Sequence, residues 1–260
     1  MRIVTTSFAS FAGDIINNRT ITTTGTLRLE AVTGTGGVVN PNAQIISGSG
    51  IFQNATTSST ANVVGLLINN SNTTAGVTFA NNMQVSGTFT HTAGIVNMGT
   101  NTLTVGTTTS LIGTYAYAAG RVVGKLKKFI NAGPVSWTFP VGTLAANQNA
   151  IVNFTTAPSA AGSLTVEFKT GTPGTTNLPI TQSGLEITDV SPTGYWTIDA
   201  GNSLAGGTYT ITADASGFKN KAATPATLSS LTNLRLIKRP SAGNWIVATG
   251  TSAVDRKSVV

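Results

Sequence analysis

The sequence predicts an all-β protein in which an N-terminal parallel β-helix (a β-solenoid) is followed by an antiparallel β-sandwich. The 260-residue chain contains 29 glycines, and charged residues make up only 9% of it, against about 25% in an ordinary soluble domain. Residues 31–120 contain no Asp, Glu, Lys or Arg. Short apolar segments separated by Gly, Asn, Ser or Thr run along the chain, a pattern typical of strands joined by tight turns.

Residues 1–119 are expected to form the solenoid, because their apolar segments are only three to five residues long and recur at a regular spacing. Gly65, Gly76, Gly87 and Gly99 lie 11, 11 and 12 residues apart, and two such steps predict a coil of about 22 residues. The expected strands are the segments 26–29, 43–46, 50–52, 65–68, 76–79, 87–90, 94–97 and 102–105.

The stacking of coils explains why residues 31–120 carry no charge. Equivalent residues of successive coils lie roughly 4.8 Å apart, so outward charges of one sign would repel each other. Thr and Asn form neutral hydrogen-bonded ladders instead, while Val, Ile and Leu fill the inward positions. We therefore expect this region to serve as a stalk or spacer.

Residues 120–260 are expected to form the sandwich, because their apolar segments are longer and alternate cleanly with polar residues. Leu164, Val166 and Phe168, for example, share one face of a strand. Pro140 lacks a backbone donor, so its strand is expected to end there or to lie at a sheet edge. The expected strands are 121–129, 135–141, 150–155, 162–169, 194–198, 207–213, 233–238 and 244–249.

Three motifs in this order resemble large secreted surface proteins of the Bacteroidetes. The segment GTFTHTAGIVNMGTNTLTVG (87–106) resembles their solenoid coil, GRVVGKLKKFINAGPVSWTFPVGT (120–143) the junction, and GYWTIDA (194–200) a Tyr-Trp strand of the sandwich. The resemblance covers about residues 76–215 and implies an extracellular or cell-surface, adhesin-like or filamentous protein, commonly exported by the type IX route. Such proteins usually carry a signal peptide and a C-terminal sorting domain; neither is recognised here, so we expect a fragment.

The charge distribution argues against nucleic acid as a partner. The net charge is +7, from 15 basic and 8 acidic residues, but the basic residues are thinly spread and do not alternate with aromatic ones. No apolar run approaches the roughly 18 residues that a membrane helix needs. Cysteine is absent, which excludes disulfides and thiolate metal sites.

Catalytic residues are not expected, and neither are cofactors or a metal site. His91 is the only histidine, and we expect it to point inward or to sit at a coil corner. A polysaccharide lyase or hydrolase needs clustered carboxylates, yet the solenoid region offers only Asp14 and Glu30. Asp189 and Asp199 could join a Ca²⁺ site through loop carbonyls, but their spacing favours simple surface solvation.

The candidate binding residues are Arg121, Lys125 and Lys127, which a strand would place on one face, with Lys128 on the other. They could hold an anionic surface polysaccharide or lipopolysaccharide. The competing interpretation, which we favour, is a solvated strip whose lysines discourage unwanted strand pairing.

The three tryptophans raise the question of carbohydrate stacking. Trp137 and Trp196 alternate in phase with apolar residues and are expected in the core, whereas the position of Trp245 stays open.

The leading hypothesis is a non-enzymatic extracellular structural or adhesin-like protein fragment whose solenoid acts as a stalk. The alternative is an accessory, carbohydrate-binding region of a secreted polysaccharide-active enzyme, tested by the exposure of Trp245. A third option is ice binding through rows of threonine such as those in 22–25 and 106–110. Surface polysaccharide or another surface component is the expected partner, and the ligand and oligomeric state stay open.

Overall fold

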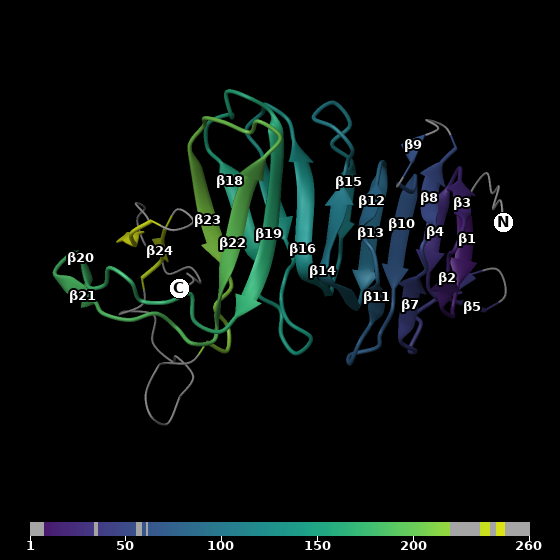
Figure 1. Ribbon diagram of the computed structural model, residues 1–260, viewed down its shortest axis with the longest axis horizontal. Helices are drawn as coiled ribbons and strands as arrows, with labels where there is room; N and C mark the ends of the chain where they lie inside the picture. The colour runs from purple at the N-terminus through teal and green to yellow at the C-terminus, as the bar shows by residue number, and fades with distance from the viewer. Residues whose placement is uncertain are drawn as a thin grey trace.

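The computed structural model describes residues 8–33, 36–55, 59–60, 62–218, 235–239 and 243–247. These residues form strands, turns and loops without any helix, so the all-β prediction is confirmed (Figure 1). In the described part of the chain, therefore, no helix is long and apolar enough to cross a membrane.

Two ladders of parallel strands run through the N-terminal part of the chain (Figure 1). The first ladder has the order β1 (Phe8–Phe11), β4 (Thr26–Leu29), β10 (Gly65–Asn69), β13 (Thr88–Ala93) and β15 (Thr114–Tyr117). The second has the order β2 (Ile15–Ile16), β7 (Gln44–Ser47), β11 (Val77–Phe79), β14 (Ile95–Val105) and β16 (Arg121–Ile130), and β12 (Met83–Val85) pairs with the second half of β14.

A third, smaller sheet lies beside these ladders. Its strands are β3 (Thr20–Thr23), β8 (Ile51–Asn54) and β9 (Ser59–Thr60); β3 and β8 are parallel, whereas β9 runs antiparallel to β8. A separate hairpin joins β5 (Ala31–Thr33) to β6 (Gly36–Val38). Every apolar segment that the sequence predicted as a strand between residues 26 and 105 lies at least partly within one of these strands.

The pairing changes from parallel to antiparallel at β16. This strand lies parallel to β14 on one side and antiparallel to β19 (Gly162–Thr170) on the other, and β22 (Gly194–Gly201) follows. A second antiparallel sheet holds β17 (Ser136–Phe139), β18 (Ala150–Phe154) and β23 (Tyr209–Ala213). The hairpins β20 (Ile180–Gln182) with β21 (Leu185–Ile187), and β24 (Ile237–Lys238) with β25 (Ile246–Val247), complete the described strands.

The strands predicted after residue 120 are therefore present. For the last two, 233–238 and 244–249, only part lies within the described residues. β17 ends one residue before Pro140 and lies at the edge of its sheet, as the missing proline donor predicted. One cluster of buried apolar residues extends from Ile15 to Phe218, across the predicted domain boundary between 119 and 120, and that boundary stays a prediction.

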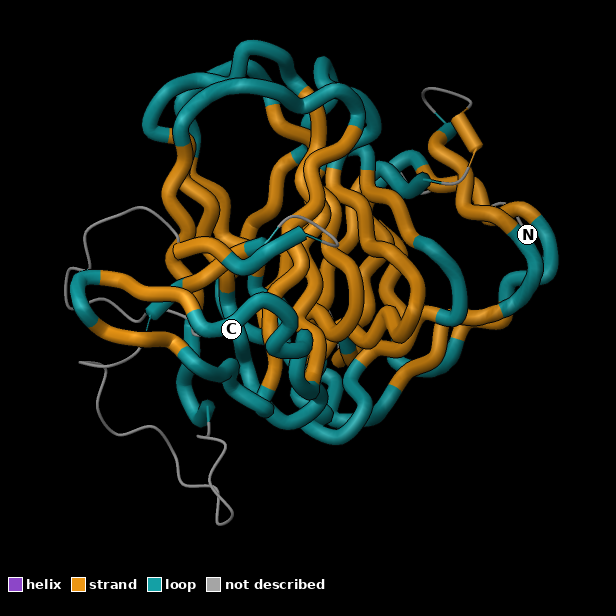
Figure 2. Tube along the Cα trace, turned by 60° about the vertical axis from the view of Figure 1, so that its left-hand side comes forward, coloured by secondary structure: helices purple, strands orange, loops and turns teal. Residues whose placement is uncertain are grey.

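The interior is built from apolar side chains that stack in register from strand to strand. Leu27, Leu66 and Phe89 are paired in sequence along the first ladder and are at most 1% exposed. Burial of one such leucine contributes about 2 kcal/mol to folding. Figure 2 shows the strands through the centre of the molecule, with many of the loops along its rims.

The spacing between stacked residues departs from the predicted 22. Leu66 pairs with Phe89 and Leu103 with Leu126, both 23 residues apart, close to the prediction. Leu27 and Leu66, however, are 39 residues apart. The difference arises because the β5–β6 hairpin and β9 are inserted between these strands without joining the ladder.

Buried asparagines form one corner of the stack. The side chains of Asn40 and Asn70 are inaccessible to solvent, and the two residues are bridged in parallel. The Nδ2 of Asn40 donates to the carbonyl of Ala12 (2.9 Å), and that of Asn70 donates to the carbonyl of Asn42 (2.8 Å). Each amide thus links successive turns of chain, so neutral asparagine bonding of the expected kind occurs at a buried corner.

The next corner has no room for a side chain. Gly94 has a φ of +101°, and a Cβ there would lie 1.8 Å from the carbonyl oxygen of Asn70. Only glycine allows this close backbone contact at such a φ.

Candidate functional site

The outward face of β16 carries the predicted basic residues. Arg121, Val123, Lys125 and Lys127 alternate with buried neighbours and are each half-buried. The three basic residues therefore share one face, as the alternation predicted. Whether this face binds a ligand stays a prediction.

Arg121 differs from the two lysines because its guanidinium is occupied. It donates from Nε to the carbonyl of Thr143 and from Nη2 to that of Leu144, and Nη1 lies 3.3 Å from Oδ1 of Asn147. Burial lowers the pKa of this guanidinium. Arg121 thus holds the 143–147 loop against β16, which leaves Lys125 and Lys127 as the accessible cations of the strip.

The surroundings of the two lysines are of mixed sign. Lys127 lies between Thr104 and Thr165 on the neighbouring strands, and Thr165 pairs in turn with Asp199. The Nζ of Lys127 lies 5.1 Å from the ring centroid of Phe129. The face therefore presents two ammonium groups and threonine hydroxyls, which can hold a sulfate or carboxylate, with a carboxylate two strands away.

A cavity of about 330 Å³ lies at the edge of this face, and its lining includes Val123, Leu144, Glu167 and Lys169. The Nζ of Lys169 is 3.7 Å from Oε2 of Glu167, so the two charged groups in the lining form an ion pair. This pairing makes the cavity itself a poor site for an anion, because the cation already has a partner.

Lys128 is the residue of this strand that the sequence analysis left without a role. It faces inward, is 1% exposed, and its Nζ has no hydrogen-bond partner among the described residues. The Nζ lies 4.1 Å from the ring centroid of Trp137, and burial lowers the pKa of Lys128 to about 8. Two consecutive lysines in one strand were the available signal, because one of them must face the core.

His91 points inward, as expected, and both ring nitrogens are engaged. Its Nε2 donates to the carbonyl of Gly94 (3.0 Å), and its Nδ1 accepts from the hydroxyl of Tyr115 (3.0 Å). The ring stacks on Phe89, with centroids 5.5 Å apart. Burial lowers the pKa of His91 to about 4 and raises that of Tyr115. A neutral imidazole with both nitrogens bonded acts here as a packing and hydrogen-bonding element.

The tryptophans are tied into the protein. Trp137 and Trp196 pack partly buried against the main core, as predicted. Trp196 stacks on Phe218 at 5.4 Å and donates to the carbonyl of Gln148 (2.8 Å).

Trp245 is buried, at 4% exposure, and its Nε1 donates to the carbonyl of Gly174 (3.1 Å). The possibility that Trp245 presents an open face to a sugar is therefore wrong, because Val190 and Ile237 are buried in the same cluster and Arg239 lies over its ring.

The few carboxylates of the N-terminal part do not meet. Glu30 is buried and lies 3.1 Å from Arg28, while Asp14 accepts a bond from the backbone N–H of Ile45 (2.8 Å). Across the described ranges, no three residues of the types His, Cys, Asp and Glu gather into a metal-binding group.

The outward threonines are not arranged in a uniform row where the pairing is described. Thr22 pairs with Gln53, and Thr78 lies between Ile45 and Asn97. The rows mix apolar, amide and hydroxyl side chains, so the flat threonine array that ice binding needs does not form at these positions.

No family model, curated protein or solved structure matches the chain.

Proposed function

We propose that the chain is a non-enzymatic structural or adhesive segment of an extracellular, cell-surface protein. In this proposal, the parallel strands stack as a β-solenoid that acts as a stalk or spacer, and the chain continues into an antiparallel β-sandwich. The parallel registers carry the proposal: Leu27, Leu66, Phe89 and Tyr115 follow one another along four paired strands.

The chemistry of residues 31–120 supports a spacer. With no Asp, Glu, Lys or Arg in this region, successive turns stack without charge repulsion, and amides such as those of Asn40 and Asn70 bond from turn to turn. A stack of this kind is lengthened by adding turns, because each turn contacts only its neighbours.

Location at the cell surface rests on the resemblance of 87–106, 120–143 and 194–200 to Bacteroidetes surface proteins. Lys125 and Lys127 then face the medium at the junction, where we place the contact with anionic surface polysaccharide.

The test of location uses antibodies raised against this chain, applied to intact and to permeabilised cells of the organism that makes it. We expect labelling of intact cells and its loss after brief treatment with an external protease. Labelling that requires permeabilisation would overturn the surface proposal.

A further inference from the structure

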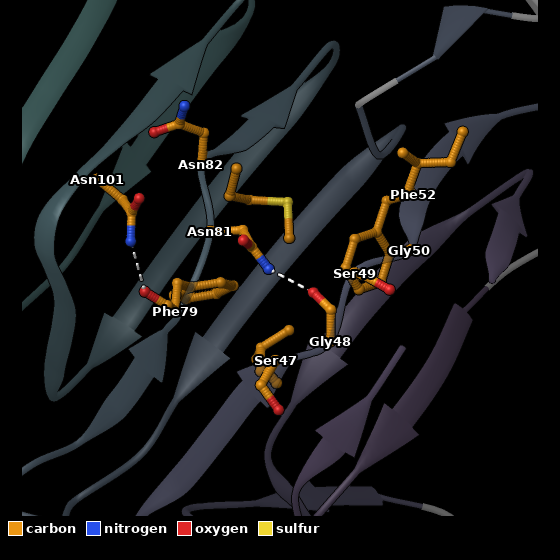
Figure 3. A pocket seen from close by; sticks show the side chains of 12 residues that line it. Ser47, Gly48, Ser49, Gly50, Phe52, Phe79, Asn81, Asn82 and Asn101 are labelled. Atoms are coloured by element: carbon orange, nitrogen blue, oxygen red, sulfur yellow. Dashed lines mark hydrogen bonds between the residues drawn. The ribbon is translucent and has the colours of Figure 1, made fainter. Parts of the chain in front are cut away.

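A groove opens between β8 and β12, and we call it the β8–β12 groove. Its volume is about 300 Å³. It is lined by twelve residues from the end of β7 to the start of β8, from the end of β11 to the start of β12, and from β14: Ile46, Ser47, Gly48, Ser49, Gly50, Ile51, Phe52, Phe79, Asn81, Asn82, Met83 and Asn101 (Figure 3). Such a volume lies at the lower end of small-ligand sites, roughly 300–1,000 Å³.

The groove exists because the parallel pairing is interrupted here. β8 pairs with β3, and β12 pairs with β14, but in the described residues β8 and β12 do not pair with each other. β9 pairs with Gln53 and Asn54, and Val63 bridges to Val85, so the inserted chain separates the two strands at one end. The opposite end, beside Phe52 and Met83, stays open as the groove.

Three asparagine amides line the groove, and each uses one end for an internal bond. The Nδ2 of Asn81 donates to the carbonyl of Gly48 (2.7 Å), and the Nδ2 of Asn101 donates to that of Phe79 (3.2 Å) (Figure 3). The Oδ1 of Asn82 accepts from the backbone N–H of Thr102 (2.8 Å).

These internal bonds fix the amides and leave their other ends available. Among the described residues, Oδ1 of Asn81, Oδ1 of Asn101 and Nδ2 of Asn82 have no protein partner. The groove thus offers two acceptors and one donor group on positioned side chains. A hydroxyl group both donates and accepts, so it can satisfy either kind of site.

The apolar part of the lining complements these amides. Phe52 is half-buried, and Figure 3 shows Phe52 and Phe79 on either side of the Asn81 amide. Aromatic rings beside fixed amides suit a ligand with both C–H and O–H groups. None of the twelve lining residues is ionisable, so a charged ligand would find no opposite charge there.

We propose that the β8–β12 groove binds a neutral saccharide. A peptide added as a strand is disfavoured, because pairing with β9 leaves only Ile51 and Phe52 of β8 open along that edge. The proposal goes beyond the stalk function and does not rest on it, since a stalk needs no groove.

The test measures binding of the whole chain to a panel of neutral oligosaccharides, the α- and β-linked hexamers of glucose, mannose and galactose, by saturation-transfer NMR and calorimetry. The blocking variant is Ser49→Trp, because Ser49 is exposed and its replacement fills the groove from the solvent side. Ser110→Trp, an exposed serine outside the groove, is the matched control. Asn82→Asp is a second variant, which keeps the acceptor for Thr102 and removes the free donor.

We expect at least one neutral hexamer to bind, Ser49→Trp and Asn82→Asp to weaken binding by about tenfold or more, and Ser110→Trp to leave it within about twofold. Thermal unfolding of each variant verifies that it is folded, and Asn82→Asp decides the question if Ser49→Trp is not. The proposal is overturned if no neutral hexamer binds at about 10 mM, if binding survives both substitutions, or if only charged polysaccharides or peptides bind. None of these outcomes bears on labelling of intact cells, so the two proposals fail separately.

Discussion

Replacement of the buried Lys128 by methionine is expected to stabilise the protein. The side chain is 1% exposed, and it faces Trp137 with no hydrogen-bond partner at Nζ among the described residues. Its strand neighbours in register, Val105 and Leu164, bring no opposite charge. Methionine keeps the unbranched shape and removes the charge.

The magnitude follows from two opposing effects. Burial lowers the pKa of Lys128 from 10.5 to about 8, so keeping the ammonium charged at neutral pH costs about 3 kcal/mol. The contact with the Trp137 ring, at 4.1 Å, returns about 2 kcal/mol at most. Desolvation is the larger effect, and we expect Lys128→Met to raise the free energy of unfolding by about 1–3 kcal/mol at pH 7.

The pH dependence has a definite sign. Because the pKa of Lys128 is lower in the folded protein, the unfolded chain binds more protons between pH 8 and 10.5. The natural protein therefore gains stability as the pH rises through this window, whereas Lys128→Met lacks that gain. The advantage of the variant should shrink between pH 7 and pH 10.

Urea unfolding followed by circular dichroism at both pH values measures these differences. Lys127→Met is the matched control, since Lys127 lies on the outward face, and its change should stay within about 0.5 kcal/mol. The reasoning is refuted if Lys128→Met is less stable than the natural protein at pH 7, or if its advantage does not shrink by pH 10.

Three further predictions concern acid stability, backbone packing and binding. Because burial lowers the pKa of His91 from 6.5 to about 4, the folded protein should lose up to about 3 kcal/mol of stability as the pH falls from 6.5 to 4. Urea unfolding of His91→Gln should lack this loss, and an equal loss in the variant would assign it to other groups. Gly94→Ala should lower the free energy of unfolding by about 2–4 kcal/mol, because its Cβ would collide with a carbonyl oxygen. The control Gly99→Ala, with nothing within 4 Å of its Cβ, should cost only about 1–2 kcal/mol, and similar thermal shifts for both would contradict the collision argument. The double substitution of Lys125 and Lys127 by Gln should weaken binding to dextran sulfate by about tenfold at low salt in surface plasmon resonance. An unchanged affinity would favour the solvated-strip interpretation.

Much of the local structure follows from sequence patterns that act over a few residues. Alternation with a period of two places Arg121, Lys125 and Lys127 on the outward face of β16 and Lys128 on the inward face. The missing donor of Pro140 ends β17, for the same local reason. The all-β class, most strand positions and the inward direction of His91 could therefore be predicted.

The coil length could be predicted only in part. Glycine spacing between 65 and 99 reflects the turns near β10 to β14, where the stacked residues are 23 apart. The 39 residues between Leu27 and Leu66 depend on segments that leave the stack, and nothing in their composition distinguishes them from stacking strands.

The sequence by itself determined which residues form strands and which face of each strand is apolar, because these properties depend on near neighbours. Only the tertiary structure decided that Lys128 meets Trp137, that Trp245 is covered, and that Arg121 is occupied by the 143–147 loop. The β8–β12 groove belongs to this second group, because Phe52 and Asn82 come together through the pairing of strands far apart in the chain. Such contacts are set by how whole strands pack against each other, which no short stretch of sequence records.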